Sequence, residues 1–148
     1  MGVARAAVEL TAVPAAVERL WSEPEGWAAF VDGFGHVVSL DPSWPAVGAR
    51  LTWESHAGGR GRVVEQVLRQ TPGEELVVTQ EDPQLRGVQR LAFAPVAADP
   101  DRIGVALELD YALLRSGPFM VVADPLFVRR ALRDSLRRTL AGVARALA

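Results

Sequence analysis

The sequence predicts an α+β fold in which a curved antiparallel sheet of about seven strands wraps around one long C-terminal helix. Helical patterns occur in only two places, before residue 35 and after residue 124, whereas strand-like segments and turn residues fill the chain between them. The final segment also carries apolar residues at steps of three and four, which indicates a helix lying on an apolar surface. A sheet that grips a helix in this way tends to enclose a cavity, so a binding function is expected.

Length and composition narrow the class of protein. The chain has 148 residues, enough to bury a core as one domain over 1–148 without metal or disulfide support. It contains no cysteine, which excludes disulfides, thiolate catalysis and cysteine-bound zinc. The net charge of −2 gives no electrostatic signature for nucleic acid. No apolar run reaches the ~18 residues of a membrane span and no leader-like segment opens the chain, so a cytoplasmic protein is expected.

The N-terminal part predicts one strand and two short helices. Residues 3–12 alternate in polarity as a half-buried strand does. Pro14 stands at a typical helix start, and the helical pattern continues to Trp21. The run Glu23-Pro24-Glu25-Gly26 then breaks this helix, and a second short helix is predicted over 27–31.

Turn residues then recur at the spacing of hairpins. The turns are predicted at Asp41-Pro42, Ala57-Gly58-Gly59, Thr71-Pro72-Gly73, Glu81-Asp82-Pro83 and Asp99-Pro100-Asp101. Six strands are predicted among them, at 35–41, 48–56, 60–70, 75–81, 85–94 and 102–114. In the strand predicted at 85–94, alternation puts Gln89, Leu91 and Phe93 on one face. In the strand predicted at 102–114, it puts Leu109 and Tyr111 on one face.

The closing helix is predicted to begin at Asp124-Pro125, a capping residue followed by proline in the first turn. Its apolar stripe consists of Val128, Leu132, Leu136, Leu140, Val143 and Leu147. Five arginines fall largely off this stripe, namely Arg129, Arg130, Arg133, Arg137 and Arg138. One side of the helix is therefore expected to face the sheet and the other to face water.

The order strand, two short helices, six strands and a long helix resembles the helix-grip fold. Its superfamily joins START lipid-transfer domains, birch-pollen-allergen-like proteins and bacterial polyketide cyclases. The motifs that carry the resemblance are Val13 to Trp21, Trp27, the turn Asp41-Pro42-Ser43-Trp44-Pro45 with Gly48, Arg62 through Glu65, the strand Asp101 to Tyr111 and the closing helix. The resemblance covers essentially the whole chain and implies a pocket for a hydrophobic ligand. Carriers, cyclases, hydrolase-like members and regulators share this fold, so the fold alone does not assign a function.

Several kinds of active site are not supported by the sequence. His36 and His56 are the only histidines and have no partner at ligand spacing, so no metal site is expected. No serine lies in a Gly-x-Ser-x-Gly motif. The glycines of Gly58-Gly59-Arg60-Gly61 precede a strand rather than a helix, which indicates a hairpin turn instead of a phosphate loop. No cofactor is expected.

Aromatic and polar residues on the expected inner surfaces predict a ligand pocket. A cavity of a few hundred Å³ should lie between the sheet and the helix, lined by Trp53, Tyr111 and at least one of Trp27 and Phe30. The full set of candidate ligand-binding residues is Trp27, Phe30, Trp53, Ser55, Gln89, Leu91, Phe93, Leu109, Tyr111, Phe119 and Phe127. The competing interpretation of each aromatic residue is that it belongs to a solid core.

The predicted inner face holds few groups for catalysis. Tyr111 is the one candidate catalytic residue, and a phenol donates a hydrogen bond more readily than it accepts a proton near neutral pH. Glu108 and Asp110 fall on the opposite face from Tyr111, and Arg62 and Glu65 fall on opposite faces of their strand. Gln66 or Gln80 can face inward only if its strand takes the matching register, and the sequence leaves the register of residues 60–81 open. A buried carboxylate or histidine in the pocket would favour an enzyme, and the sequence does not single one out.

The leading functional hypothesis is therefore the binding of a small hydrophobic, lipid- or polyketide-like molecule by a carrier or accessory protein. One alternative is an enzyme that resembles the aromatase/cyclase members, with Tyr111, Ser55 or Gln89 polarising a carbonyl. Another is a protein-interaction module that uses the arginine-rich helix face or a sheet edge, which a pocket filled by its own tryptophans would favour. The sequence allows an oligomer without indicating one.

Overall fold

The computed structural model describes residues 1–114 and 124–148. These residues form seven strands, two α-helices and one 3₁₀ helix. In chain order they are β1 (Gly2–Leu10), α1 (Pro14–Ser22), η1 (Pro24–Ala29), β2 (Phe34–Leu40), β3 (Arg50–Ser55), β4 (Arg62–Thr71), β5 (Glu75–Glu81), β6 (Leu85–Val96), β7 (Asp99–Leu113) and α2 (Pro125–Ala146).

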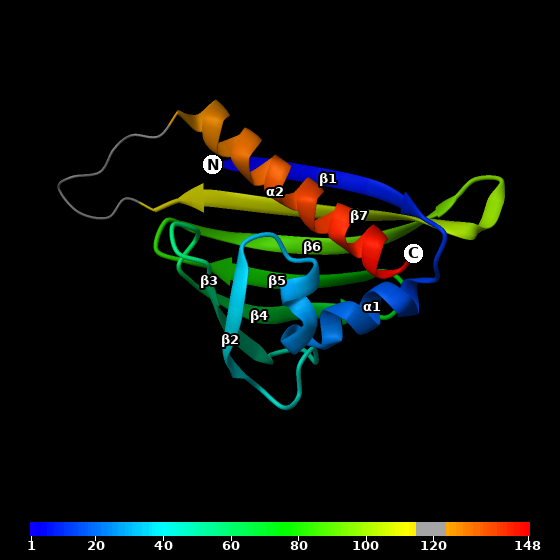
Figure 1. Cartoon of the computed structure of the whole chain (residues 1–148), viewed down its shortest axis with the longest axis horizontal. Coiled ribbons are helices and arrows are strands. Elements are labelled where there is room, and N and C mark those ends of the chain that lie inside the picture. Colours follow the sequence, from blue (N-terminus) through cyan, green and yellow to red (C-terminus); the bar gives the residue numbers. More distant parts are fainter. Residues whose placement is uncertain (115–123) are drawn as a thin grey trace.

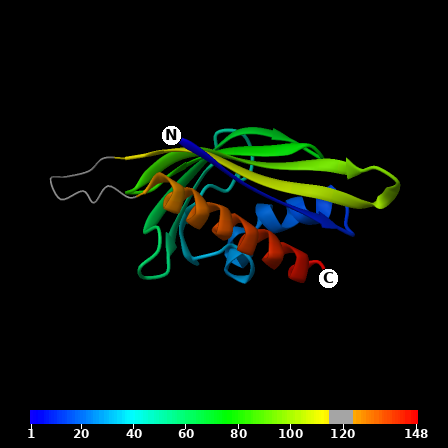
Figure 2. The same ribbon diagram turned by 90° about the horizontal axis from the view of Figure 1, so that it is seen from above.

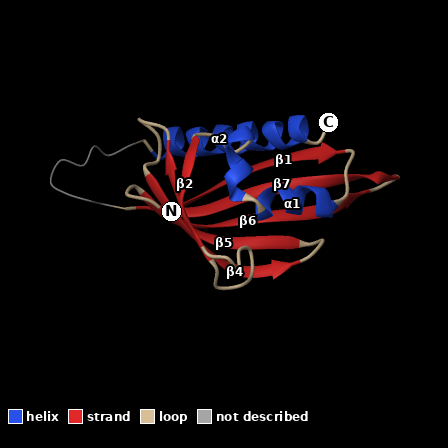
Figure 3. Ribbon diagram, turned by 60° about the horizontal axis from the view of Figure 1, so that its bottom comes forward, coloured by secondary structure: helices blue, strands red, loops and turns tan. Residues whose placement is uncertain are grey.

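The seven strands form one antiparallel sheet in the order β1-β7-β6-β5-β4-β3-β2. Strands β2 to β7 are joined in sequence as a meander, and β1 adds to the free edge of β7. Figures 1 and 2 show the sheet curving over α2, with α1 and η1 on the same face as that helix. Figure 3 shows this two-layer arrangement by secondary structure. The predicted α+β fold with a C-terminal helix laid against the sheet is confirmed.

The alternation of β7 fixes which face of the sheet is covered. Ile103, Val105, Leu107, Leu109 and Tyr111 are all buried, whereas the residues between them are half-buried or exposed. This is the pattern expected of a strand with one face on the core.

Two predicted boundaries are wrong for identifiable reasons. The hairpin between β6 and β7 turns at residues 97–98, with Ala98 at a φ of 94°, because the pairing of Val96 with Asp99 extends both strands past the expected turn. The second short helix spans Pro24–Ala29 rather than 27–31, since proline has no N–H and is well tolerated in the first turn of a helix.

The C-terminal helix docks through its apolar stripe and through one close contact. Leu136, Leu140 and Val143 are buried. Gly142 lies against Phe30 at the end of η1, where a Cβ would come within 2.8 Å of the Phe30 Cα. A larger residue at this position would therefore push the helix away from η1.

Polar contacts around Asp32, just after η1, complete the docking. Its backbone N–H donates to Oγ1 of Thr139 at 3.0 Å, and its carboxylate accepts from Oγ of Ser135 at 2.8 Å and from Nε of Arg138 at 3.0 Å. Successive turns of α2 are thereby tied to one residue.

No helix within the described residues has the length and apolarity needed to cross a membrane.

Substitutions on the two faces of α2 test this docking. Replacing Leu136 with alanine should lower the free energy of unfolding by about 2–5 kcal/mol, because it leaves a cavity beneath the helix. Replacing the exposed Arg137 with alanine should cost less than about 1 kcal/mol. Urea denaturation of the two variants measures the difference, and similar losses would show that the helix faces the sheet differently.

Candidate functional site

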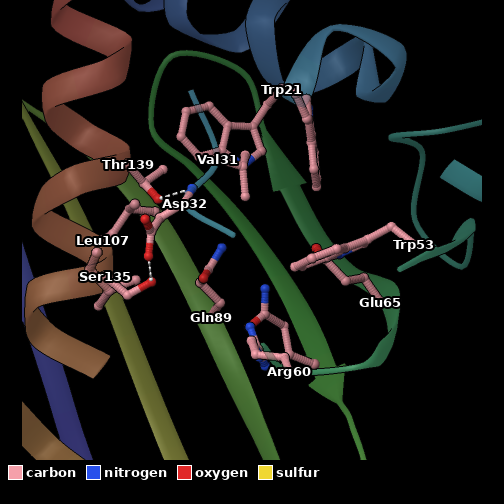
Figure 4. A pocket seen from close by; sticks show the side chains of 13 residues that line it. Trp21, Val31, Asp32, Trp53, Arg60, Glu65, Gln89, Leu107, Ser135 and Thr139 are labelled. Atoms are coloured by element: carbon pink, nitrogen blue, oxygen red, sulfur yellow. Dashed lines mark hydrogen bonds between the residues drawn. The ribbon is translucent and has the colours of Figure 1, made fainter. Parts of the chain in front are cut away.

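A cavity of about 50 Å³ lies between the sheet, α2 and the segment that follows η1. Figure 4 shows side chains from both layers converging on it. Its lining residues are Trp21, Trp27, Val31, Asp32, Trp53, Arg60, Glu65, Gln80, Gln89, Leu107, Ser135, Leu136 and Thr139. The cavity stands where the sequence predicted one, but it is several times smaller than the few hundred Å³ expected.

Packed tryptophans account for the small volume. Trp21 and Trp27 are buried side by side, with ring centroids 6.4 Å apart, and Phe30 packs on Trp21 at 5.3 Å. Indole rings are large, so two of them packed together next to the cavity leave little free volume there. The Trp27 indole N–H donates to the carbonyl of Leu20 at 3.1 Å, which holds its ring in place.

A buried carboxylate occupies the sheet side of the cavity. Glu65, in the middle of β4, is only 2% exposed, and the indole N–H of Trp53 on the neighbouring β3 donates to its Oε2 at 2.8 Å. Burial raises the pKa of Glu65 to about 7, although the Trp53 hydrogen bond, the charge of Arg60 and the amide of Gln80 act in the opposite direction. A carboxyl group with such a pKa can both release and accept a proton near neutral pH.

Arg60 reaches the same region from the hairpin between β3 and β4. Its Nε donates to Oδ2 of Asp82 at 2.7 Å, its Nη1 donates to Oε1 of Gln80 at 3.1 Å, and its guanidinium lies 6.0 Å from the centre of the Trp53 ring. Asp82 is itself fixed, because its other oxygen accepts from the backbone N–H groups of residues 84 and 85. We call Arg60, Glu65 and Gln80 the polar end of the cavity.

The opposite side of the cavity is closed by the Asp32 contacts of α2. The hydrogen bond from Arg138 is the main reason that the pKa of Asp32 lies below its ordinary value; the Ser135 hydroxyl lowers it further, and partial burial opposes both. Asp32 therefore remains ionised when Glu65 is half protonated. The two carboxyl groups that line the cavity thus differ in charge near neutral pH.

The structure brings together only part of the predicted site. Trp27, Trp53 and Gln89 line the cavity. Leu91 and Leu109 are buried in the core, and Phe93 packs against that core while partly exposed. Phe30 lines an open surface hollow next to Arg138 and Arg145, and Phe127 is 69% exposed in the first turn of α2. Phe119 lies outside the described residues.

Two predicted polar residues take other places. Ser55 is used within its own hairpin, where its hydroxyl donates to the carbonyl of His56 and accepts from the N–H of Gly61. Tyr111 is buried but is absent from the cavity lining, which differs from the prediction. It lies near the end of β7 opposite Gly2 of β1, and a Cβ on Gly2 would be 2.6 Å from the Tyr111 hydroxyl oxygen. The cavity instead adjoins Leu107, four residues earlier on the same face.

Sequence reasoning missed the polar end, although a signal for Glu65 was present. Val63, Glu65 and Val67 alternate on one face of β4 and all three are buried, so a charged residue stands at a core position between two valines. The register that places Gln80 inside and Gln66 on the other face was left open by the sequence. The inward turn of Arg60 carries no local signal, because glycine flanks it on both sides.

Within the part of the chain that the structure describes, no three or more histidine or acidic residues are grouped so that they could hold a metal ion. The lining of the cavity offers several polar side chains. They are the Glu65 carboxyl group, which titrates near pH 7, the Asp32 carboxylate, one guanidinium, two amides and two hydroxyls.

Comparisons with known proteins identify relatives of the fold. The model of a family described as polyketide cyclase / dehydrase and lipid transport matches residues 1–148. No curated protein matches the chain significantly. A START superfamily protein from Mycobacterium smegmatis has a similar structure with a TM-score of 0.74 at 12% identity, over 96% of this chain and 94% of that chain.

Two further solved structures illustrate the range of similar proteins. A protein from Thermus thermophilus has a TM-score of 0.72 at 20% identity, over 97% of this chain and 95% of that chain. Norcoclaurine synthase from Thalictrum flavum, solved in complex with dopamine and hydroxybenzaldehyde, has a TM-score of 0.68 at 12% identity, over 99% and 86%. The family resemblance is confirmed, and at these identities the structural likeness concerns the fold alone.

The pKa of Glu65 predicts how stability depends on pH. Because the value of about 7 in the folded protein lies above the ordinary 4.5, the folded state holds this proton more tightly. The resulting stabilisation is fully present below pH 4.5 and is lost as the pH rises through 7. Between about pH 5 and about pH 8 the wild type should lose about 2–3 kcal/mol relative to Glu65→Gln. Urea denaturation at both pH values tests this, and parallel pH profiles would contradict it.

Proposed function

The chain belongs to the polyketide cyclase / dehydrase and lipid transport family, and from this premise we propose that it binds a small hydrophobic molecule between the sheet and α2. The supporting observation is the cavity, in which an apolar wall of Trp21, Trp27, Leu107 and Leu136 lies between the polar end and the Asp32 contacts of the opposite side. Such a wall with a few convergent polar groups is typical of small-molecule sites. The protein would act as a carrier or accessory protein for this molecule.

The size of the cavity limits how the ligand enters. A volume of about 50 Å³ is well below the ~150 Å³ of an apolar cavity that admits benzene. A ring-sized ligand must therefore displace side chains that now fill the site, with Leu136 and Trp21 as the apolar residues at the junction of the two layers. Binding should be accompanied by a small outward shift of α2 or of the segment that holds Trp21.

A matched pair of variants tests the location of the ligand. Toluene and naphthalene titrations followed by tryptophan fluorescence should show saturable binding, because three tryptophans line the cavity. Leu107→Phe fills the cavity and should weaken binding at least about tenfold, whereas Leu109→Phe, buried on the same strand face but away from the cavity, should leave it within about twofold.

Native mass spectrometry of protein from its own host supplies an independent measurement, because a retained natural ligand would add a discrete mass. Absence of both a co-purifying molecule and saturable binding would overturn the proposal. Equal weakening by the two phenylalanine variants would place the ligand elsewhere.

Glu65 favours a second candidate function, acid–base catalysis on a carbonyl substrate of the polyketide type. In its ionised form Glu65 would remove a proton from the carbon next to a carbonyl group, while Arg60 donates to the carbonyl oxygen as that oxygen gains negative charge. A pKa near the working pH suits both the removal and the later return of this proton. This assignment replaces Tyr111 as the candidate catalytic residue.

A turnover assay separates the two functions. With a linear 1,3,5-triketone as substrate surrogate, Glu65→Gln should lower turnover by about 10²-fold or more, because the amide cannot take the proton. Tyr111→Phe should retain nearly full activity, since Tyr111 does not line the cavity. The rate should rise with pH through about 7, where Glu65 ionises. Wild-type protein that binds the triketone and leaves its product spectrum unchanged would decide against catalysis for this substrate class.

A further inference from the structure

Two buried side-chain nitrogens in the described part of the chain have no hydrogen-bond partner, Nε of Arg133 and Nη2 of Arg60, and only Arg60 lines the cavity. Its Nη2 is buried and has no hydrogen-bond acceptor among the residues that the structure describes, whereas Nε and Nη1 are both engaged. A buried donor on a charged group is costly to leave unpaired. Arg60 is also a lining residue of the cavity, so the side chain that carries this unused donor is part of the proposed ligand site.

The rest of the guanidinium is held in a fixed orientation. Asp82 is almost fully buried, and it accepts from Arg60 with one oxygen and from two backbone N–H groups with the other. The Trp53 ring lies beside the guanidinium, and Gln80 accepts from its second nitrogen. A donor supported in this way needs no reorganisation when an acceptor arrives.

We propose that the ligand of this cavity carries a carboxylate group, which accepts a hydrogen bond from Nη2 of Arg60, and that Glu65 takes up a proton when this ligand binds. The inference rests on the proposed binding function and adds the chemical class of the ligand. Guanidinium groups are the side chains best suited to carboxylates, both in charge and in geometry. Gln89, which lies between Arg60 and Ser135 in Figure 4, can contribute an amide N–H to the second carboxylate oxygen.

The charges around the site explain why a proton must accompany the ligand. The charged groups that face Glu65 are Arg60 and, behind it, Asp82, with Asp32 on the opposite side of the cavity held by Arg138. Asp82 already balances Arg60, so an incoming carboxylate would add a second uncompensated negative charge if Glu65 stayed ionised. Protonation of Glu65 removes that repulsion. Because its pKa is about 7, the free-energy cost of this protonation is small near neutral pH.

Benzoate and benzyl alcohol, which have nearly the same size, separate recognition of the charge from entry of the ring. Calorimetric titration of the wild type at about pH 6 should show benzoate bound at least about tenfold more tightly than benzyl alcohol. From about pH 6 to about pH 8 the benzoate affinity should fall by about tenfold. Titrations at the higher pH in two buffers of different ionisation enthalpy measure proton uptake, which should be close to one proton per bound benzoate. Benzyl alcohol should show neither effect.

Two variants with a matched control assign these effects to residues. Arg60→Gln should weaken benzoate by about tenfold or more and leave benzyl alcohol within about twofold, which also reports that the cavity is intact. Arg62→Gln, two residues away but exposed and paired with Glu54, should change neither affinity. Glu65→Gln should abolish proton uptake and flatten the pH dependence while benzoate still binds.

The outcomes distinguish the inference from the function on which it rests. Equal affinities for benzoate and benzyl alcohol in the wild type, or benzoate binding unchanged in Arg60→Gln, would overturn the carboxylate assignment and leave ligand binding in place. Binding of benzoate without proton uptake would overturn the role of Glu65. Failure of benzoate, benzyl alcohol and toluene alike to bind would overturn the binding function itself, and the inference with it.

Discussion

Burial of the apolar stripe of α2 against one face of the sheet is the constraint on which the rest of this structure depends. The sheet has a continuous apolar face along β7, and without a helix over it that face would be exposed to water. The stripe alone would let the helix slide or rotate, because apolar contacts have little directionality. The contacts of Asp32 with Ser135, Arg138 and Thr139, together with the fit of Gly142 on Phe30, remove this freedom.

The cavity with polar groups lies inside a tryptophan-rich core, at the place where α2 docks on the sheet. Trp21, Trp27 and Trp53 are buried and line the cavity, which has a volume of only about 50 Å³. At this place the sheet presents Glu65 and Gln80, and the β3–β4 hairpin sends Arg60 inward. Polar groups buried together in this way stabilise the fold less than an apolar cluster of the same volume would. Buried groups with a shifted pKa, such as Glu65, are typical of functional sites.

The two carboxyl groups of the cavity differ in pKa because their surroundings differ. Asp32 is paired with Arg138 at the edge of the helix, and its pKa is lowered. Glu65 lies deeper, has a neutral indole as its direct donor, and has a pKa near 7. One group is therefore a fixed structural charge, whereas the other can change its protonation state in the physiological range.

The sequence by itself determined the class of the fold and the face of the helix. Periodicity of three and four in α2 and of two in β6 and β7 follows directly from backbone geometry, so these elements and their buried sides could be predicted from local patterns. The alternation of Val63, Glu65 and Val67 contained a local signal for the buried carboxylate, which the sequence-based prediction missed. Strand pairing, in contrast, decided that Gln80 and not Gln66 faces inward, and the position of α2 along the sheet decided that Leu107 rather than Tyr111 borders the cavity. The inward turn of Arg60 and the small volume of the cavity were also decided by tertiary structure. Both depend on how side chains distant in sequence share a limited space, and local patterns carry no information about that.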